Sequence, residues 1–96
     1  MTEPTITVQD NAEQGRYEAL DESGVVAGFA AYERDADRVV FTHTVVDDAF
    51  EGRGVGSALA RAGLDAAREA GARVVPRCSF IRGYVERHPE YADLTS

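Results

Sequence analysis

Four short segments that alternate apolar and polar residues occupy the first half of the chain, and they constrain its fold more than any other feature. They span residues 5–9, 16–21, 25–33 and 39–46, and the gaps between them carry turn-forming residues. Alternation of this kind is typical of strands, and gaps this short join antiparallel neighbours. The sequence therefore predicts a four-stranded antiparallel meander, in which Gly28 indicates a bulge or a close backbone approach.

The second half of the chain changes to a helical pattern. Residues 55–70 have helical periodicity, and their predicted buried stripe consists of Val55, Leu59, Ala62, Ala66 and Ala70. Gly71 stands where a glycine commonly ends a helix. A short strand over residues 72–75 and a second helix over residues 80–87 follow. One crossover helix makes the fourth and fifth strands parallel where they are neighbours.

Length and composition are typical of one globular domain over residues 1–96, and we expect an α+β (loosely α/β) fold with a mixed sheet. The chain has no apolar run long enough for a membrane span, and its first residues lack the features of a secretory signal. The lone Cys78 cannot form an internal disulfide, which favours a cytoplasmic location. A net charge of −7 argues against nucleic acid as the partner.

The sequence FEGRGVGS at residues 50–57 places three glycines at alternate positions between a predicted strand and a predicted helix. The first backbone N–H groups of a helix lack internal partners and favour an anion. Glycines at positions 52, 54 and 56 leave room for a phosphate to reach those groups, and Arg53 adds a charged contact. The alternative is a flexible loop whose last glycine packs against a strand; the strand–loop–helix context favours phosphate binding.

Charge and motif spacing narrow the kind of phosphate site. Residues 1–50 hold 3 arginines and 11 acidic residues, whereas residues 51–88 hold 7 arginines and 4 acidic residues, so the basic part begins at the glycines. The chain has no lysine, which excludes a P-loop. A dinucleotide site fits poorly, because Ser57 stands where the last glycine of that motif belongs and no acidic residue ends the next strand.

The loop resembles the coenzyme A pyrophosphate loop of GNAT-type N-acetyltransferases, Arg/Gln-x-x-Gly-x-Gly/Ala, and reads here Glu51-Gly52-Arg53-Gly54-Val55-Gly56. The segments FTHT at residues 41–44, Pro76-Arg77-Cys78-Ser79-Phe80 and His88-Pro89-Glu90-Tyr91 are similar to the short, cysteine-containing branch of that superfamily. The resemblance implies an acetyl-CoA-dependent N-acetyltransferase with no metal. Two departures stand out: Glu51 replaces the usual Arg or Gln, and Val45 stands where many relatives have a glutamate.

The resemblance also assigns residues to the cofactor. The backbone of Val45 and Val46 would hold the pantetheine arm, and Cys78 would lie near the thioester. The pyrophosphate would be held by Gly52, Arg53, Gly54, Val55, Gly56 and Ser57.

Three residues are candidates for catalysis, each with a structural alternative. His43 is a candidate general base, although it could simply hydrogen-bond the backbone or Thr44. Cys78 precedes the second helix, a setting that favours a thiolate able to accept an acetyl group covalently; its alternative is a small buried apolar residue. The resemblance suggests that Tyr84 protonates the leaving thiolate, and the alternative is a core tyrosine.

The acceptor side is predicted to be open. Full-length GNAT enzymes carry two helices between their first two strands, whereas only DNAEQG at residues 10–15 fills that gap here. An open cleft favours a protein or peptide amine over an enclosed small molecule, and the acidic half would steer a cationic acceptor. The alternative function is a non-catalytic module that binds acetyl-CoA or CoA and acts with a partner. The first strands leave an exposed edge that could pair into a homodimer.

Overall fold

A computed structural model describes residues 6–95 of the chain and contains one five-stranded sheet in the order β1-β2-β3-β4-β5. The strands are β1 (Thr7–Asn11), β2 (Arg16–Leu20), β3 (Val26–Asp35), β4 (Arg38–Val46) and β5 (Arg73–Pro76). The helices are α1 (Val55–Glu69) and α2 (Ser79–Arg87), with short 3-10 helices η1 (Asp48–Phe50) and η2 (Pro89–Thr95).

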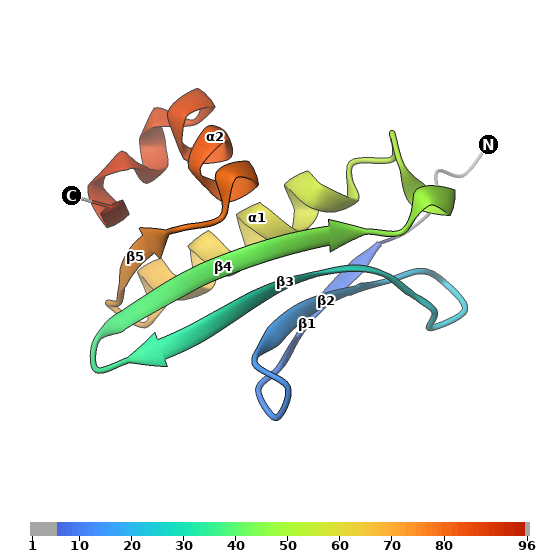
Figure 1. Ribbon diagram of the computed structural model, residues 1–96, viewed down its shortest axis with the longest axis horizontal. Coiled ribbons are helices and arrows are strands. Elements are labelled where there is room, and N and C mark those ends of the chain that lie inside the picture. The colour runs from blue at the N-terminus through green and yellow to red at the C-terminus, as the bar shows by residue number, and fades with distance from the viewer. Residues whose placement is uncertain (1–5, 96) are drawn as a thin grey trace.

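The strands from β1 to β4 form the predicted antiparallel meander, and β5 pairs with β4 in parallel through the α1 crossover. Figure 1 shows α1 and α2 on the same side of the sheet, so the described chain forms two layers. Only residues 12–15 separate β1 from β2, so no helix lies between them. This confirms the α+β class, the mixed sheet and the missing N-terminal helices. Thr5, the first residue of the first predicted strand, lies outside the described residues.

Two bulges interrupt the sheet. Gly28 pairs with Ala19 while Val26 pairs with Leu20, which leaves one extra residue in β3. A Cβ on Gly28 would lie 2.7 Å from the carbonyl oxygen of Val45, so the predicted bulge and the predicted close approach are both confirmed. The second bulge is in β4, where Thr42 is the extra residue between the pairs Phe41–Tyr32 and His43–Ala31.

The predicted buried stripe of α1 is wrong for most of its positions. Val55 and Leu59 are buried, but Ala62 and Ala66 are only half-buried and Ala70 is exposed. The helix buries instead Ala60, Gly63, Leu64 and Ala67. The helix comes close to the sheet at Gly63, where a Cβ would lie 2.8 Å from Cζ of the buried Phe41 ring. Packing against this large ring therefore decides which face is buried, rather than the row of alanines.

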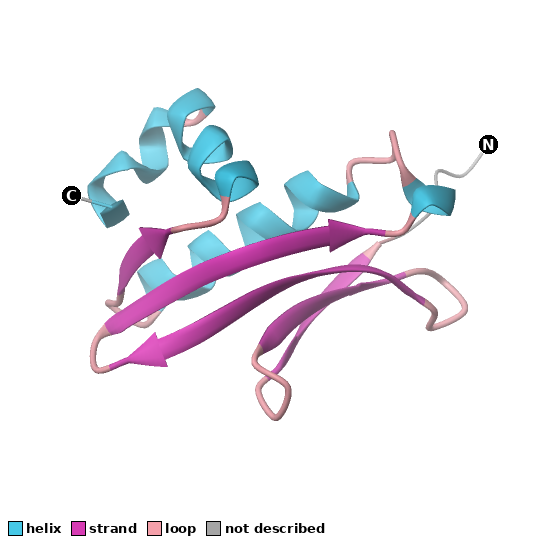
Figure 2. Cartoon of the chain, in the orientation of Figure 1, coloured by secondary structure: helices cyan, strands magenta, loops and turns pink. Residues whose placement is uncertain are grey.

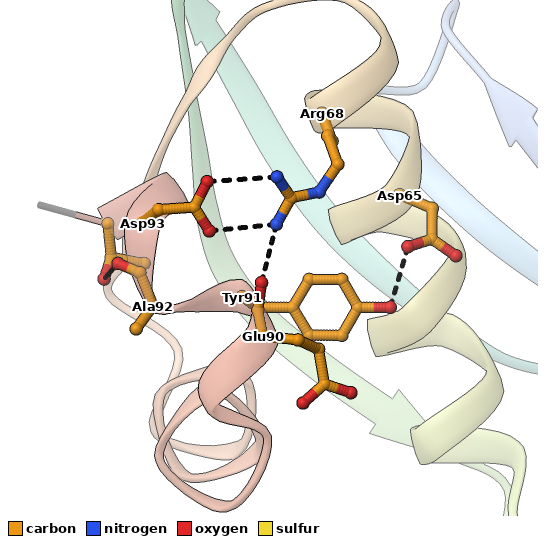
Figure 3. Close-up of polar contacts among 7 residues, drawn as sticks. Asp65, Arg68, Glu90, Tyr91, Ala92 and Asp93 are labelled. Carbon is orange, nitrogen blue, oxygen red and sulfur yellow. Dashed lines mark hydrogen bonds and ion pairs between the residues drawn. The ribbon is translucent and has the colours of Figure 1, made fainter.

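Hydrogen bonds and an ion pair join the C-terminal helix η2 to α1 (Figure 3). Arg68 donates to both carboxylate oxygens of Asp93, at 2.9 and 3.0 Å, and to the carbonyl oxygen of Glu90 at 2.7 Å. The Tyr91 hydroxyl donates to Asp65 at 2.7 Å, and this hydrogen bond raises the pKa of Tyr91 to about 12. Arg68 holds the pKa of Asp93 below its usual value. These contacts fix the end of the chain beside α1, and with it the end of α2.

Candidate active site

The sheet is split between β4 and β5, and the split is the centre of the candidate site. Backbone pairing between the two strands ends at Phe41 and Pro76. The Cys78 N–H then donates to the carbonyl oxygen of Phe41 at 2.9 Å, and the chain turns away into α2. Beyond this point β4 continues to Val46 with no strand of the described chain on that side. The exposed backbone edge offers hydrogen-bonding groups to an extended ligand.

The bulge at Thr42 decides which residues face the split. The Asp47 N–H donates to Ala27 of β3 at 2.8 Å. Because successive residues of a strand direct their backbone groups to opposite edges, Val46 and Thr44 direct theirs to the split, and Val45 directs its own to β3. Of the two valines predicted to hold a ligand by the backbone, the pattern therefore places Val46 at the split and Val45 inside the sheet pairing.

The glycine-rich loop forms the start of α1, as predicted (Figure 2). Gly52 and Gly54 have φ of +80° and +77°, and a Cβ on either would meet nothing within 4 Å. These two glycines are needed for their left-handed backbone and not for a close packing contact. Gly54 is the N-cap of α1 and has no side-chain cap. The first helical hydrogen bond runs from Ala58 N–H to Gly54, which leaves the N–H groups of Val55, Gly56 and Ser57 without a described acceptor.

Gly56 has a different role, because a Cβ there would lie 2.7 Å from Cζ of Phe80. The Phe80 ring from α2 thus reaches the start of α1 and closes one side of a pocket of about 460 Å³. The pocket is lined by Val46, Phe50, Glu51, Gly52, Gly54, Val55, Gly56, Ser57 and Phe80. The exposed end of β4 and the free N–H groups of α1 therefore share one cavity.

The two charged residues of the loop are placed differently with respect to the pocket. Arg53 is not part of the pocket lining; its guanidinium lies 5.7 Å from the centre of the Phe50 ring, toward the turn that follows β2. Glu51 does line the pocket and brings a negative charge to it. Positive potential in the pocket therefore comes from the N-terminus of α1 and not from Arg53.

Cys78 lies at the floor of the split, at the N-cap position of α2, and is 6% exposed. Its sulfur is 3.3 Å from the hydroxyl oxygen of Thr44, on the edge of β4 that faces the split. Sequence reasoning did not select Thr44 as a functional residue. One signal could have found it. Side chains alternate along the strand from the buried Phe41, and when the extra residue Thr42 is left out of the count, Thr44 falls on the same face as Phe41 and Cys78.

His43 and Cys78 are not brought together. His43 is exposed on the sheet face opposite α1, with its ring edge-on to Phe29 at 5.8 Å between centroids. Its Nδ1 is 3.3 Å from the hydroxyl of Thr42, not from that of Thr44. Any proton transfer by His43 would therefore take place on the outer face of the sheet.

Tyr84 is in the core and is 2% exposed. Its ring stacks on His88 at 3.9 Å, and the His88 Nδ1 donates to the Tyr84 carbonyl oxygen at 2.8 Å. A hydrogen bond with Tyr84 raises the pKa of the Arg61 guanidinium. Tyr84 is not part of the pocket lining.

Residues 16–94 match the family profile of the GCN5-related N-acetyl-transferases. This match spans most of the chain and includes the split, the loop and Cys78. The chain belongs to the GCN5-related N-acetyltransferase family.

Two solved structures show the same fold. A GCN5-like protein from Staphylococcus aureus, assigned to the N-acetyltransferases, is 25% identical and superposes with a TM-score of 0.70 over 100% of this chain and 91% of its own. Nourseothricin acetyltransferase is 21% identical, with a TM-score of 0.52 over 74% of this chain and 56% of its own, and supports the fold alone. No curated protein sequence matches the chain.

The residues of this GCN5-related N-acetyltransferase suit a phosphate-bearing thioester such as acetyl-CoA. Three free N–H groups at a helix start fit a pyrophosphate, and the open edge of β4 fits an amide-bearing arm. Glu51 is the one residue of the lining that opposes an anion. Within residues 6–95, no helix is long and apolar enough to cross a bilayer, and no group of three or more His, Cys, Asp or Glu residues could hold a metal ion.

Proposed function

We propose that this chain transfers the acetyl group of acetyl-CoA to an amine, with Cys78 as a transient acetyl carrier. The observation that carries the proposal is the common location of three elements: the free N–H groups of α1, the unpaired edge of β4 and the Cys78 thiol. The pyrophosphate is assigned to the backbone of Val55, Gly56 and Ser57. The pantetheine arm is assigned to the edge of β4 at Val46.

The covalent step uses the Cys78 thiol, which lies beside Thr44 at the floor of the split. The Cys78 thiolate attacks the thioester carbonyl carbon, a new C–S bond forms, and the coenzyme A thiolate leaves and takes up a proton. The Val46 N–H, directed to the split, is the donor assigned to the developing oxyanion. An amine then attacks the carbonyl carbon of the acetylated Cys78 and loses a proton to water, and the C–S bond breaks to restore the thiolate.

A protein or peptide amine is the acceptor class that we favour. No helix of the described chain covers the face of the sheet that carries His43. An amine carried on a larger surface can reach such an open face.

Intact-mass spectrometry after mixing with acetyl-CoA tests the covalent step. Because the chain has no lysine, an acetyl adduct can form on few groups, chiefly Cys78 and the N-terminal amine. We expect a single acetyl adduct that hydroxylamine removes, as it does a thioester, and that is absent from Cys78→Ala. An adduct that persists in Cys78→Ala would contradict the acetyl-cysteine step.

A non-catalytic acetyl-CoA or CoA-binding module is the second candidate function. It is favoured by the burial of Cys78 and by Val45, which leaves no carboxylate at the end of β4. In this case calorimetry would detect coenzyme A binding, while acetyl-CoA incubated with the protein and an amine peptide would remain unconsumed.

A further inference from the structure

A second pocket lies on the face of the sheet opposite α1, beside the point where β4 and β5 separate. It has a volume of about 350 Å³, and its lining includes Val40 of β4, Val75 of β5 and Arg77, the residue before Cys78. Val40 and Val75 are register partners, and their neighbours Val39 and Val74 are buried at 2% exposure. Since side chains alternate along a strand, Val40 and Val75 point to the outer face and form an apolar floor.

Most of the charges around this floor are already paired. Arg38 and Asp35 form an ion pair at 2.6 Å. Arg34 lines the pocket, but its guanidinium lies 3.7 Å from Asp10 and 5.0 Å from the centre of the Tyr32 ring. These groups add little net charge for a ligand, because each has a partner of its own.

Two opposite charges remain above the apolar floor. The carboxylate of Glu33 and the guanidinium of Arg77 are both exposed, and neither has a described side-chain partner. Glu33 comes from the end of β3 and Arg77 from the end of β5, so the two charges reach the same pocket from either side of β4. The pocket lining therefore offers a carboxylate that can pair with a cation, a guanidinium that can form two hydrogen bonds with a carboxylate, and an apolar surface between them.

We propose that this pocket binds a small zwitterion: an ammonium and a carboxylate on a short apolar body, as in an amino acid or at the acidic N-terminus of a peptide. The ammonium pairs with Glu33, the carboxylate pairs with Arg77, and the body packs on Val40 and Val75. The pocket adjoins the split, so its ligand is the acetyl acceptor; this last clause alone rests on the proposed function. The acidic residues of β3 thus act together with an arginine and do not form a purely anionic surface.

Binding is tested on the full chain by NMR, without acetyl-CoA, so that its outcome is separate from that of acetyl transfer. Leucine carries both charges, isoamylamine lacks the carboxylate, and 4-methylpentanoate lacks the amine. We expect leucine to shift the amide signals around Val40, Val75 and Arg77, and each analogue to bind about three- to tenfold more weakly. Equal binding of all three ligands, or shifts confined to the start of α1, would overturn the proposal.

Two variants with a matched control complete the test. Arg77→Gln and Glu33→Gln change exposed side chains, so both are expected to keep the native spectrum, and each should weaken leucine binding about three- to tenfold. Arg87→Gln removes an exposed arginine outside the pocket lining and should leave binding unchanged. Unaltered binding in both pocket variants would refute the assignment. A peptide amide with an N-terminal glutamate is titrated in parallel, and its affinity relative to leucine distinguishes a peptide end from a free amino acid as the ligand. Acetylated product is measured afterwards and reports only on the role of the ligand as acetyl acceptor.

Discussion

Glu51 brings a negative charge to the pocket at the start of α1, and Glu51→Gln is therefore expected to strengthen coenzyme A binding. The pocket volume of about 460 Å³ sets the scale of the effect. A sphere of that volume is about 10 Å across, so an anion inside it lies within about 5–10 Å of the Glu51 side chain, and Coulomb's law in water gives about 0.4–0.8 kcal/mol per unit charge. A pyrophosphate carries more than one charge, and salt screens part of the repulsion. The expected gain in affinity is about two- to fivefold.

Isothermal titration calorimetry with coenzyme A measures this gain, with Glu69→Gln as the control. Glu69 is exposed at the opposite end of α1, so its replacement makes the same change of net charge far from the pocket. The advantage of Glu51→Gln should shrink as the ionic strength rises, because the interaction is screened. The control should bind like the original chain at every salt concentration.

Unchanged or weaker binding by Glu51→Gln would refute the reasoning. It would mean that no phosphate lies near Glu51, and the assignment of the pyrophosphate to the backbone of residues 55–57 would lose its support. An equal gain in both variants would point to the net charge of the whole molecule and not to the pocket.

Single contacts of Gly63, Thr44 and Tyr91 can each be tested by substitution. Gly63→Ala should lower the free energy of unfolding by about 1–2 kcal/mol in urea denaturation, because overpacking against the buried Phe41 ring outweighs the gain in helix propensity; a variant as stable as the original would contradict this. Thr44→Val removes the hydroxyl beside Cys78 and should slow alkylation of the thiol by iodoacetamide about three- to tenfold, whereas Thr44→Ser should react normally. The pKa of Tyr91 is about 12 in the folded chain against 10.0 for a free tyrosine. The folded state therefore keeps a proton that the unfolded chain loses, and stability should fall as the pH rises from about 10 to about 12; Tyr91→Phe should weaken this dependence in alkaline urea titrations.

Most of the fold could be predicted because its elements have strong local patterns. Alternation and short turns located the four strands of the meander, and Gly71 marked the end of α1 correctly: its φ is +69°, and its N–H donates to the Arg68 carbonyl at 3.1 Å. The two 3-10 helices were not predicted. η1 depends on the Asp47 side chain accepting from the Ala49 N–H at 2.9 Å, and η2 depends on tertiary contacts to Arg68, so neither has a repeating pattern.

The glycine loop could be predicted as a site, but the reasons for its glycines could not. Their alternate spacing suggested three equivalent contacts with a ligand. The structure shows that Gly52 and Gly54 have a left-handed backbone and that Gly56 lies against Phe80, which is far away in the sequence. The sequence shows where the glycines are, but the reason for each glycine depends on its backbone conformation and on the residues packed around it.

The bulge at Thr42 explains why Thr44 and not His43 contacts Cys78. In an unbroken strand, side chains at odd positions would share the face of Phe41, and His43 and Val45 would point toward α1 and the thiol. One extra residue reverses this order, so the side chains of Thr44 and Val46 point to the helix side of the sheet, and the side chain of His43 points to the outer face. The sequence FTHTVV alternates too weakly to reveal that reversal, because threonine and valine are accepted on either face of a sheet. The same reversal places the thiol and the imidazole on opposite sides of β4: Cys78 lies on the helix side beside Thr44, and His43 lies on the outer face beside Phe29.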